Sequence, residues 1–299
     1  MVGTKLSLIQ HNVNRQPEAQ QAVLQQAFES KADIVFLQEP ALAPNHGTWI
    51  CYQHPSYYPI LPEPGLSLTE IAQRPRILTY VRRLLGLQVN PRFDLASDPD
   101  FQVIEVTATE PFIAVNIYNE KARPPQVGLE PSPGPYTLDR FFQHQQLLQR
   151  LQQQPALLVG DFNLHHNWWN AVAQPSTRAD RLVRWLVGAK ATLLNDPEAG
   201  GTFIRRNLQH TSVIDLTFYT TFTRTNWTEW AYLQPTGSDH EAITFTAYFT
   251  GHQHQETPQL GFNCKKADWP AFEKHVRAYI EPIKGPHKSN LTPPRGAAW

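Results

Sequence analysis

The sequence has few cysteines and no long apolar run, and each shortage excludes a class of protein. Only Cys51 and Cys264 occur among 299 residues. They are far apart and outside any CxxC spacing, which excludes a disulfide framework and a zinc knuckle. No apolar stretch approaches the ~20 residues of a membrane span, and residues 1–10 lack the features of a secretory signal. We therefore expect an intracellular protein with no membrane partner.

The chain also lacks an excess of either charge. Lys+Arg and Asp+Glu both number 26, so the formal net charge at pH 7 is zero. Any affinity for nucleic acid would therefore depend on a local basic face. With 41% hydrophobic and 11% aromatic residues, the composition is that of a globular protein with a sizeable core.

Short apolar runs rich in Val, Ile, Phe and Tyr recur over the first 250 residues and have the length of strands. Their near-continuous hydrophobicity indicates strands covered on both faces. Three amphipathic patterns predict helices: one from Pro17, whose apolar stripe includes Phe28, and others over about 138–153 and 177–189. Irregular alternation of many strands with few helices predicts an α/β fold of layered type. The expected strands are Leu6–Gln10, Ile34–Gln38, Ile77–Val81, Val103–Val106, Ile113–Tyr118, Ala156–Val159, Ile214–Tyr219 and Ala242–Phe249.

We expect residues 1–250 to form one domain. The proline-rich segments Pro55–Pro75 and Lys121–Pro135 are predicted loops within it, because chemical motifs lie on both sides of each. Residues 251–299 are more polar and are expected to be a linker-like tail with a short amphipathic helix at about 267–280.

Polar clusters lie at the ends of four expected strands, where loops present side chains at the edge of a sheet. Taken singly, each cluster also fits a turn or a helix cap. Asp215 is harder to explain, because it lies in the apolar run VIDLTFY, where a buried carboxylate needs a partner. His240 is the expected partner, because Asp–His pairing stabilises the charged ring. The clusters are QHNVN (10–14), QE (38–39), GDFN (160–163) and SDH (238–240).

Taken together, the motifs HNVN, LQE, NIY, GDFN, GTF, VID and SDH resemble, in their order, the endonuclease/exonuclease/phosphatase superfamily over about residues 5–250. The resemblance implies a four-layered α/β sandwich of the deoxyribonuclease I type, with two packed mixed β-sheets flanked by helices. It also implies hydrolysis of phosphodiester bonds with Mg²⁺, or Mn²⁺ as an alternative.

The resemblance further implies a metal site and a water-activating group. Glu39 would bind the divalent metal, with Asp239 and Asn12 beside it. These hard oxygen ligands suit Mg²⁺ or Mn²⁺ better than zinc. Asp161 would orient or deprotonate the attacking water, while Asn163 would hold a phosphate oxygen and position Asp161.

The remaining matched residues would act on the phosphate. His240, supported by Asp215, would stabilise charge on the scissile phosphate. Tyr118 would hydrogen-bond the phosphate or assist the leaving group. Thr202 and Ser238 would have supporting network or phosphate-binding positions.

Two positions depart from the pattern of the superfamily. Its nucleases often have Tyr-x-Pro-Asn, whereas Tyr118 here is followed directly by Asn119, and the sequence leaves open whether Asn119 replaces the missing asparagine. Arg15 stands where a glycine commonly follows the first motif. Neither change removes an essential group, so we expect an active enzyme.

Further details resemble the endonuclease domain of non-LTR (LINE-type) retrotransposons. GDFNLHHNWWN is similar to a segment common in fungal elements, and FNCKKADWPAFEKHV is similar to the linker that leads there into reverse transcriptase. No sequence after Trp299 remains for that polymerase. The resemblance implies nicking of double-stranded chromosomal DNA in the nucleus, giving a 3′-hydroxyl for target-primed reverse transcription.

Other residues have less specific interpretations. His165 and His166 could form a second metal site, and Trp168 and Trp169 a base-stacking surface, but a packed loop is the better explanation for this segment. Arg205 and Arg206 are candidates for DNA contact, with a solvated turn equally acceptable. Four more arginines could form a basic patch, although strand alternation would send them to opposite faces. They are Arg74, Arg76, Arg82 and Arg83.

Two alternative functions remain open. An abasic-site repair nuclease, or another phosphodiesterase or phosphatase of the same fold, would share these motifs. A catalytically dead descendant that only binds nucleic acid is the third hypothesis. The intact residues Glu39, Asp161 and His240 argue against it.

Overall fold

The computed structural model divides the chain into two units, Met1–Gly251 and His252–Trp299. In the first unit it describes residues 5–46, 48–62, 74–84, 87–107, 111–121, 135–196, 198–205, 210–220 and 225–249. In the second it describes residues 270, 271, 273 and 274, which are helical. The rest of the helix expected at 267–280 lies outside the described residues. None of the described helices is long and apolar enough to cross a membrane.

The first of two six-stranded sheets has the order β15-β16-β1-β2-β6-β5. Its central strands β1 and β2 are parallel, and all other neighbours are antiparallel. The bounds are β1 Lys5–Asn12, β2 Ile34–Gln38, β5 Tyr57–Ile60, β6 Ile77–Arg82, β15 Thr225–Tyr232 and β16 Ile243–Phe249.

The second sheet has the order β11-β14-β10-β9-β8-β7 and the same design. Here β9 and β10 form the parallel pair, and the other pairs are antiparallel. The bounds are β7 Gln88–Pro91, β8 Phe101–Thr107, β9 Phe112–Tyr118, β10 Ala156–Asp161, β11 Ala191–Leu193 and β14 Asp215–Thr220. Two hairpins complete the strands: β3 Leu42–Asn45 with β4 Thr48–Cys51, and β12 Phe203–Arg205 with β13 His210–Ser212.

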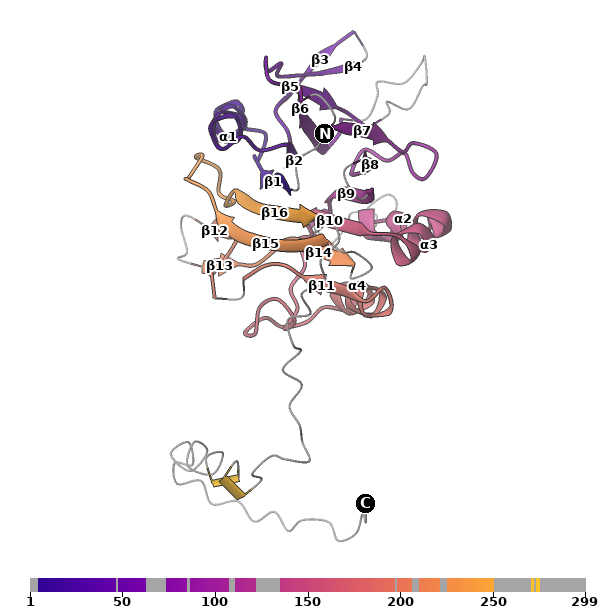
Figure 1. Cartoon of the computed structure of the whole chain (residues 1–299), viewed down its shortest axis with the longest axis vertical. Coiled ribbons are helices and arrows are strands. Elements are labelled where there is room, and N and C mark those ends of the chain that lie inside the picture. The colour runs from indigo at the N-terminus through magenta and orange to yellow at the C-terminus, as the bar shows by residue number, and fades with distance from the viewer. Residues whose placement is uncertain are drawn as a thin grey trace, which may run out of the picture. The chain divides into compact units, whose positions relative to one another are not determined.

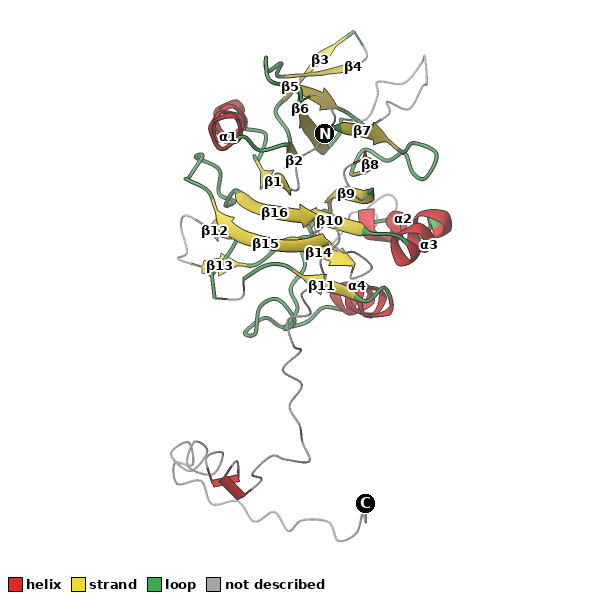
Figure 2. Ribbon diagram, in the orientation of Figure 1, coloured by secondary structure: helices red, strands yellow, loops and turns green. Residues whose placement is uncertain are grey.

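The two sheets pack face to face, and helices cover their outer faces (Figures 1 and 2). Helix α1 (Pro17–Ser30) covers the first sheet. Helices α2 (Thr137–Phe141), α3 (Gln145–Gln153) and α4 (Thr177–Gly188) cover the second. Three apolar clusters fill the spaces between these layers. The predicted four-layered α/β sandwich with two mixed sheets is therefore confirmed.

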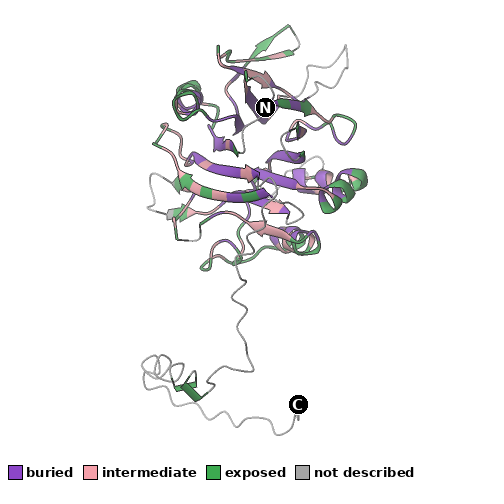
Figure 3. Ribbon diagram, viewed as in Figure 1, coloured by how far each residue is buried: buried purple, intermediate pink, exposed green. Residues whose placement is uncertain are grey.

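The central strands β2, β9 and β10 are mostly apolar because they are covered on both faces. All five residues of β2 and all six of β10 are buried, whereas the edge strand β15 alternates between buried and exposed residues (Figure 3). This difference explains why the central strands are evident from composition while the edge strands are not.

Three details of the sequence analysis were wrong. The predicted loop 55–75 contains the strand β5, which tolerates Pro59 because β5 is the edge of its sheet. The helix expected over 138–153 is two helices, α2 and α3, and the break lets both Phe141 and Leu147 reach one core. Phe28 is 48% exposed, and Leu24 is buried on α1 instead.

Candidate active site

The predicted site residues meet where the two parallel strand pairs end. Asn12, Tyr118 and Asp161 are the last residues of β1, β9 and β10. Glu39 directly follows β2, and Asp215 begins β14. Because parallel strands end at the same edge, and the two sheets pack face to face, residues from distant parts of the chain converge here. The hydrogen bond from Asn12 Nδ2 to Asp161 Oδ2 (2.9 Å) joins positions 149 residues apart.

The backbone at this edge is unusual. Among the described residues, eight non-glycine residues have positive φ, and four of them lie in the site motifs: Asn14 (47°), Arg15 (59°), Glu39 (44°) and Asn163 (47°). This region is unfavourable for residues with a side chain and persists where surrounding contacts hold it. The value at Arg15 explains why a glycine fits this position in the superfamily.

Asp161 is held by amide donors on both carboxylate oxygens. Oδ1 accepts the backbone N–H of Asn163 at 2.9 Å, and Oδ2 accepts the side-chain amides of Asn163 and Asn12, each at 2.9 Å. Asp161 is 1% exposed. These donors fix the orientation of the carboxylate, which a group that handles the proton of one particular water requires.

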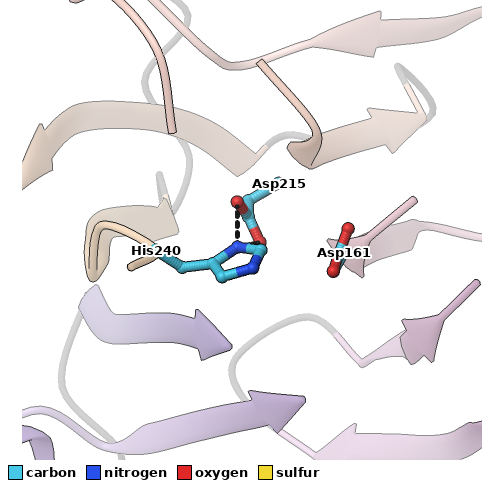
Figure 4. Close-up of side chains that lie close together, drawn as sticks. All are labelled: Asp161, Asp215 and His240. Atoms are coloured by element: carbon cyan, nitrogen blue, oxygen red, sulfur yellow. Dashed lines mark hydrogen bonds and ion pairs between the residues drawn. The ribbon is translucent and has the colours of Figure 1, made fainter. Parts of the chain in front are cut away.

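His240 and Asp215 form a buried pair beside Asp161. His240 Nδ1 lies 2.8 Å from Oδ2 and 3.1 Å from Oδ1 of Asp215. Figure 4 shows the carboxylate of Asp215 on one side of the imidazole and Asp161 beside the ring. The pairing predicted for Asp215 and His240 is confirmed. It leaves Nε2 as the ring atom that can face a substrate.

Thr202 and Ser238 support this pair through backbone contacts. Thr202 Oγ1 accepts the N–H groups of Ile214 and Asp215 at 3.0 and 2.9 Å. Ser238 Oγ donates to Asn12 O at 2.8 Å and accepts the N–H of His240 at 3.2 Å. Both residues therefore have the network position that the sequence allowed for them.

Burial and mutual charge shift two pKa values in this cluster. Desolvation, followed by the charge of Asp215, raises the pKa of Asp161 to about 7. The pKa of His240 is raised to about 9, because its attraction to Asp215, Asp161 and Asp239 outweighs desolvation. Near pH 8 the cluster therefore holds an ionised Asp161 and a protonated His240.

The predicted metal ligands fit a hard divalent cation. Glu39 Oε1 accepts from Arg15 at 2.7 Å, and Asp239 Oδ1 accepts from Asn14 Nδ2 at 3.1 Å. Among the described residues, the second oxygen of each carboxylate accepts no hydrogen bond. Asn12 Oδ1 accepts the N–H of Asn14 at 2.9 Å, which ties all three predicted ligands to one loop. An all-oxygen donor set of this kind suits Mg²⁺ or Mn²⁺.

A second group of possible ligands is a poorer metal site. Atoms of Asp161, Asp215 and His240 lie within 4.8 Å of one another, the one such cluster of three in the described chain. A protonated imidazole cannot ligate a metal, and the raised pKa of His240 keeps it protonated near neutral pH. We therefore assign this cluster to proton and phosphate chemistry.

Tyr118 and Asn119 face different surroundings. Burial, followed by the charges of Glu39 and Asp161, raises the pKa of Tyr118, and Tyr118 is paired with Asp161 in the ladder of β9 and β10. Asn119 is fully buried; its side-chain amide donates to Phe162 O at 2.5 Å, and its backbone carbonyl accepts from Asn163 Nδ2 at 2.8 Å. Asn119 thus holds the GDFN turn.

Three further groups were singled out from the sequence. His166 contacts Asp180 at 3.3 Å and Trp169 is 3% exposed, as expected for a packed loop. The four-arginine patch does not form, because Arg76 turns inward to pair with buried Asp100. Arg205 pairs with His210 through the β12–β13 ladder, and Arg206 lies outside the described residues.

Three contacts of the site were not predicted from the sequence. The ring of Phe203 packs on His240 with centroids 4.8 Å apart. Lys121 Nζ lies over the same Phe203 ring, 4.6 Å from its centroid. Arg178 Nη2 donates to Asn119 Oδ1 at 2.9 Å. Phe203 belongs to the GTF motif, which the sequence analysis had identified. No local sequence pattern indicates that Arg178, on α4, is part of the site.

Known proteins resemble this chain in sequence over one segment and in fold over most of its length. Residues 113–244 match the family described as "Endonuclease-reverse transcriptase". The endonuclease domain of TRAS1, a telomere-specific non-LTR retrotransposon, is 18% identical with a TM-score of 0.62, covering 83% of this chain and 100% of that one. AP endonuclease LMAP from Leishmania major is 11% identical with a TM-score of 0.55, covering 82% and 88%.

An endonuclease/exonuclease/phosphatase protein from Beutenbergia cavernae DSM 12333 is 18% identical with a TM-score of 0.50, covering 83% of this chain and 72% of that one. A comparison with curated proteins finds no significant match. At these identities the structural likeness concerns the fold. The chain therefore has the fold of the endonuclease/exonuclease/phosphatase superfamily, and its residues 113–244 match the endonuclease-reverse transcriptase family.

Proposed function

We propose that this protein is a metal-dependent endonuclease that nicks double-stranded DNA. The observation that carries the proposal is the placement of Asp161, held by three amide hydrogen bonds, beside the buried Asp215–His240 pair. An oriented base next to a protonated imidazole is the arrangement that in-line hydrolysis of a phosphodiester needs.

In the proposed mechanism, one residue of this chain accepts the proton of the water and others stabilise the negative charge on the phosphate. Asp161 accepts a proton from the attacking water, while Asn163, whose two amide hydrogens are donated to Asp161 and Asn119, holds that carboxylate in position instead of binding a nonbridging oxygen. The Nε2–H of His240 donates to the phosphate as negative charge develops, and Asp215 keeps the ring protonated. Tyr118, beside Glu39 and Asp161, hydrogen-bonds the phosphate.

Glu39, Asp239 and Asn12 would hold a divalent metal ion. Mg²⁺, or Mn²⁺, would supply Lewis-acid stabilisation of charge on the phosphate and the leaving oxygen. The carboxylate oxygens of Glu39 and Asp239 that accept no hydrogen bond in the described chain support this assignment.

The finer proposal is a retrotransposon-type endonuclease that acts in the nucleus and exposes a 3′-hydroxyl for target-primed reverse transcription. The family match over residues 113–244 and the fold shared with the TRAS1 endonuclease domain support it. A reverse transcriptase is the partner that this role requires. The similarity to fungal elements rests on the segment GDFNLHHNWWN alone.

Plasmid nicking tests the proposal. Supercoiled plasmid is incubated with the wild-type protein and Mg²⁺ or Mn²⁺, with and without chelator, beside Asp161→Ala and the control Asp139→Ala, whose carboxylate pairs with Arg181 on the surface of the helices. Open circles formed by the wild type and the control, but not by Asp161→Ala or with chelator, would support the proposal. Failure of the wild type with either metal would refute it.

An abasic-site nuclease is the alternative enzyme, since LMAP of Leishmania major, an AP endonuclease, has the same fold. Duplexes with and without one abasic site distinguish the two. Cleavage confined to the abasic duplex would replace the proposed function with repair. Equal nicking of both would favour the retrotransposon-type enzyme.

A further inference from the structure

A pocket lies beside the predicted metal ligand Glu39, because Arg15, which lines the pocket, forms an ion pair with Glu39. It has a volume of about 350 Å³ and is lined by residues from the start of α1, the β3–β4 hairpin and the segment before β6. Arg15 and Arg74 contribute guanidinium groups to its wall, and Tyr52 contributes an aromatic ring that is 42% exposed. The volume lies at the lower end of the range of small-ligand sites.

The two arginines are held in different ways. Arg74 donates from Nη2 to Pro40 O at 3.1 Å, and its guanidinium lies 5.5 Å from the centroid of the Trp49 ring. Neither contact is with a carboxylate, so the charge of Arg74 is not neutralised by a direct ion pair among the described residues. Arg15 is 52% exposed in its side chain and pairs with Glu39 Oε1 at 2.7 Å.

The charges around this pocket favour an anion. Arg15 and Arg74 line the same pocket, and burial, followed by repulsion from the charge of Arg15, lowers the pKa of Arg74. Glu39 is the one carboxylate that offsets this repulsion, and it is also the residue assigned to a divalent cation. A phosphate bound in the pocket would give both arginines an anionic partner while Glu39 binds the metal.

The backbone of Arg15 provides independent support. Its φ of 59° lies in the left-handed region, which a glycine adopts at less cost than a residue with a side chain. The conformation is held by a hydrogen bond from Arg15 N to Glu39 O at 2.8 Å. A strained position that carries a long cation at the mouth of a pocket indicates that the guanidinium has a binding role.

We infer that Arg15 and Arg74 form a subsite for a backbone phosphate of the DNA strand, next to the phosphate that is cleaved. The inference rests on the proposed DNA endonuclease function. The exposed ring of Tyr52 lies where it can pack against the sugar or base attached to that phosphate. This contact involves no base edge. It would therefore strengthen binding and position the protein on the DNA without giving a sequence preference.

The test is the salt dependence of DNA binding. Binding of a fluorescent duplex is measured by anisotropy from 50 to 300 mM salt, with all proteins carrying Asp161→Asn to prevent cleavage. Arg15→Gln and Arg74→Gln should each lower the slope of log K against log salt by about 0.9 and weaken binding by roughly five- to ten-fold at 0.1 M salt. Arg181→Gln, which removes an exposed arginine paired with Asp139, should change neither quantity.

A second measurement locates the contact. Duplexes that carry one neutral methylphosphonate at successive positions are bound to the Arg74-intact and Arg74→Gln proteins. The inference predicts one position near the nick at which the neutral linkage weakens binding of the intact protein but not of Arg74→Gln. This measurement needs only the Arg74→Gln variant, so it can be made even if Arg15→Gln does not fold.

The outcomes separate the subsite from the proposed function. If the wild type nicks plasmid but both glutamine variants keep the salt slope of the intact protein, the subsite is refuted and the endonuclease stands. If the wild type neither nicks nor binds DNA, the proposed function itself fails.

Discussion

Asp161 and Asp215 lie directly opposite each other on the antiparallel strands β10 and β14, and both carboxylates are close to the ring of His240. Two buried carboxylates at this separation repel each other unless a cation lies close to both or one is protonated. His240 supplies that cation, and burial, followed by the remaining repulsion from Asp215, raises the pKa of Asp161 to about 7. One strand pairing therefore brings together two of the three groups that we place next to the scissile phosphate.

The first prediction concerns the pH dependence of nicking. Activity requires Asp161 without its proton and His240 with its proton, so kcat/KM should rise through about pH 7 and fall through about pH 9. Asp215→Asn removes the charge that raises both pKa values, so both limbs should move to lower pH. The maximal rate should fall by roughly 10²- to 10⁴-fold. An Asp215→Asn profile that keeps both limbs would contradict the assignment.

The second prediction concerns the stability of the metal-free protein. The pKa of His240 is raised from 6.5 to about 9 on folding, so protonation stabilises the folded state. This contribution is fully present below pH 6.5 and is lost as the pH rises to about 9. The free energy of unfolding in urea should decline across that window. His240→Gln should be less stable at pH 6.5 and show a flatter profile from pH 6.5 to 9.5; the same decline in the variant would exclude His240 as its source.

The third prediction concerns the glycine of GDFN. Gly160 has a φ of 146°, and a Cβ at this position would lie 1.9 Å from the carbonyl oxygen of Ile117. Gly160→Ala should therefore force β9 and β10 apart and destabilise the protein by more than about 3 kcal/mol, or prevent folding. Gly188→Ala is the matched control, because its Cβ meets nothing within 4 Å at the end of α4. Urea denaturation followed by circular dichroism compares the two, and equal midpoints would show that the strands can adjust.

The fourth prediction concerns the support of the GDFN turn from α4. Arg178 donates to Asn119 Oδ1 and lies 4.0 Å from the centroid of the Tyr136 ring. Arg178→Met should cost about 1–3 kcal/mol of stability, because it leaves a buried amide oxygen without its donor. It should also lower kcat with little change in KM, since Asn119 positions Asp161 and Asn163 without contacting substrate.

Arg181→Met is the control for this experiment. Arg181 is on the same helix and also stacks on an aromatic ring, that of Phe142, but its ion pair with Asp139 is exposed. Its substitution should cost less than about 1 kcal/mol and leave kcat unchanged. Equal effects of the two substitutions on kcat would show that α4 supports the site only through general stability.

Local sequence patterns predicted much of the frame of this protein. The central strands β2, β9 and β10 are mostly apolar runs, and a strand covered on both faces can be recognised from its own residues. The edge strands could not be predicted in this way. Strand β15 mixes exposed and buried residues and β5 contains Pro59, so both depend on a neighbouring strand for their structure.

The sequence by itself determined which residues form the site: the order of HNVN, LQE, GDFN and SDH, and the presence of a carboxylate in the buried run VIDLTFY. Only the tertiary structure decided how these groups act on one another. The face-to-face packing of the two sheets brings Asn12, at the end of β1, to Asp161, at the end of β10, across 149 residues. The same folding turns Asn119 inward and sets Arg15 against Glu39. Hydrogen bonds and charge interactions act over a few ångströms in space, and spacing along the chain does not specify those distances.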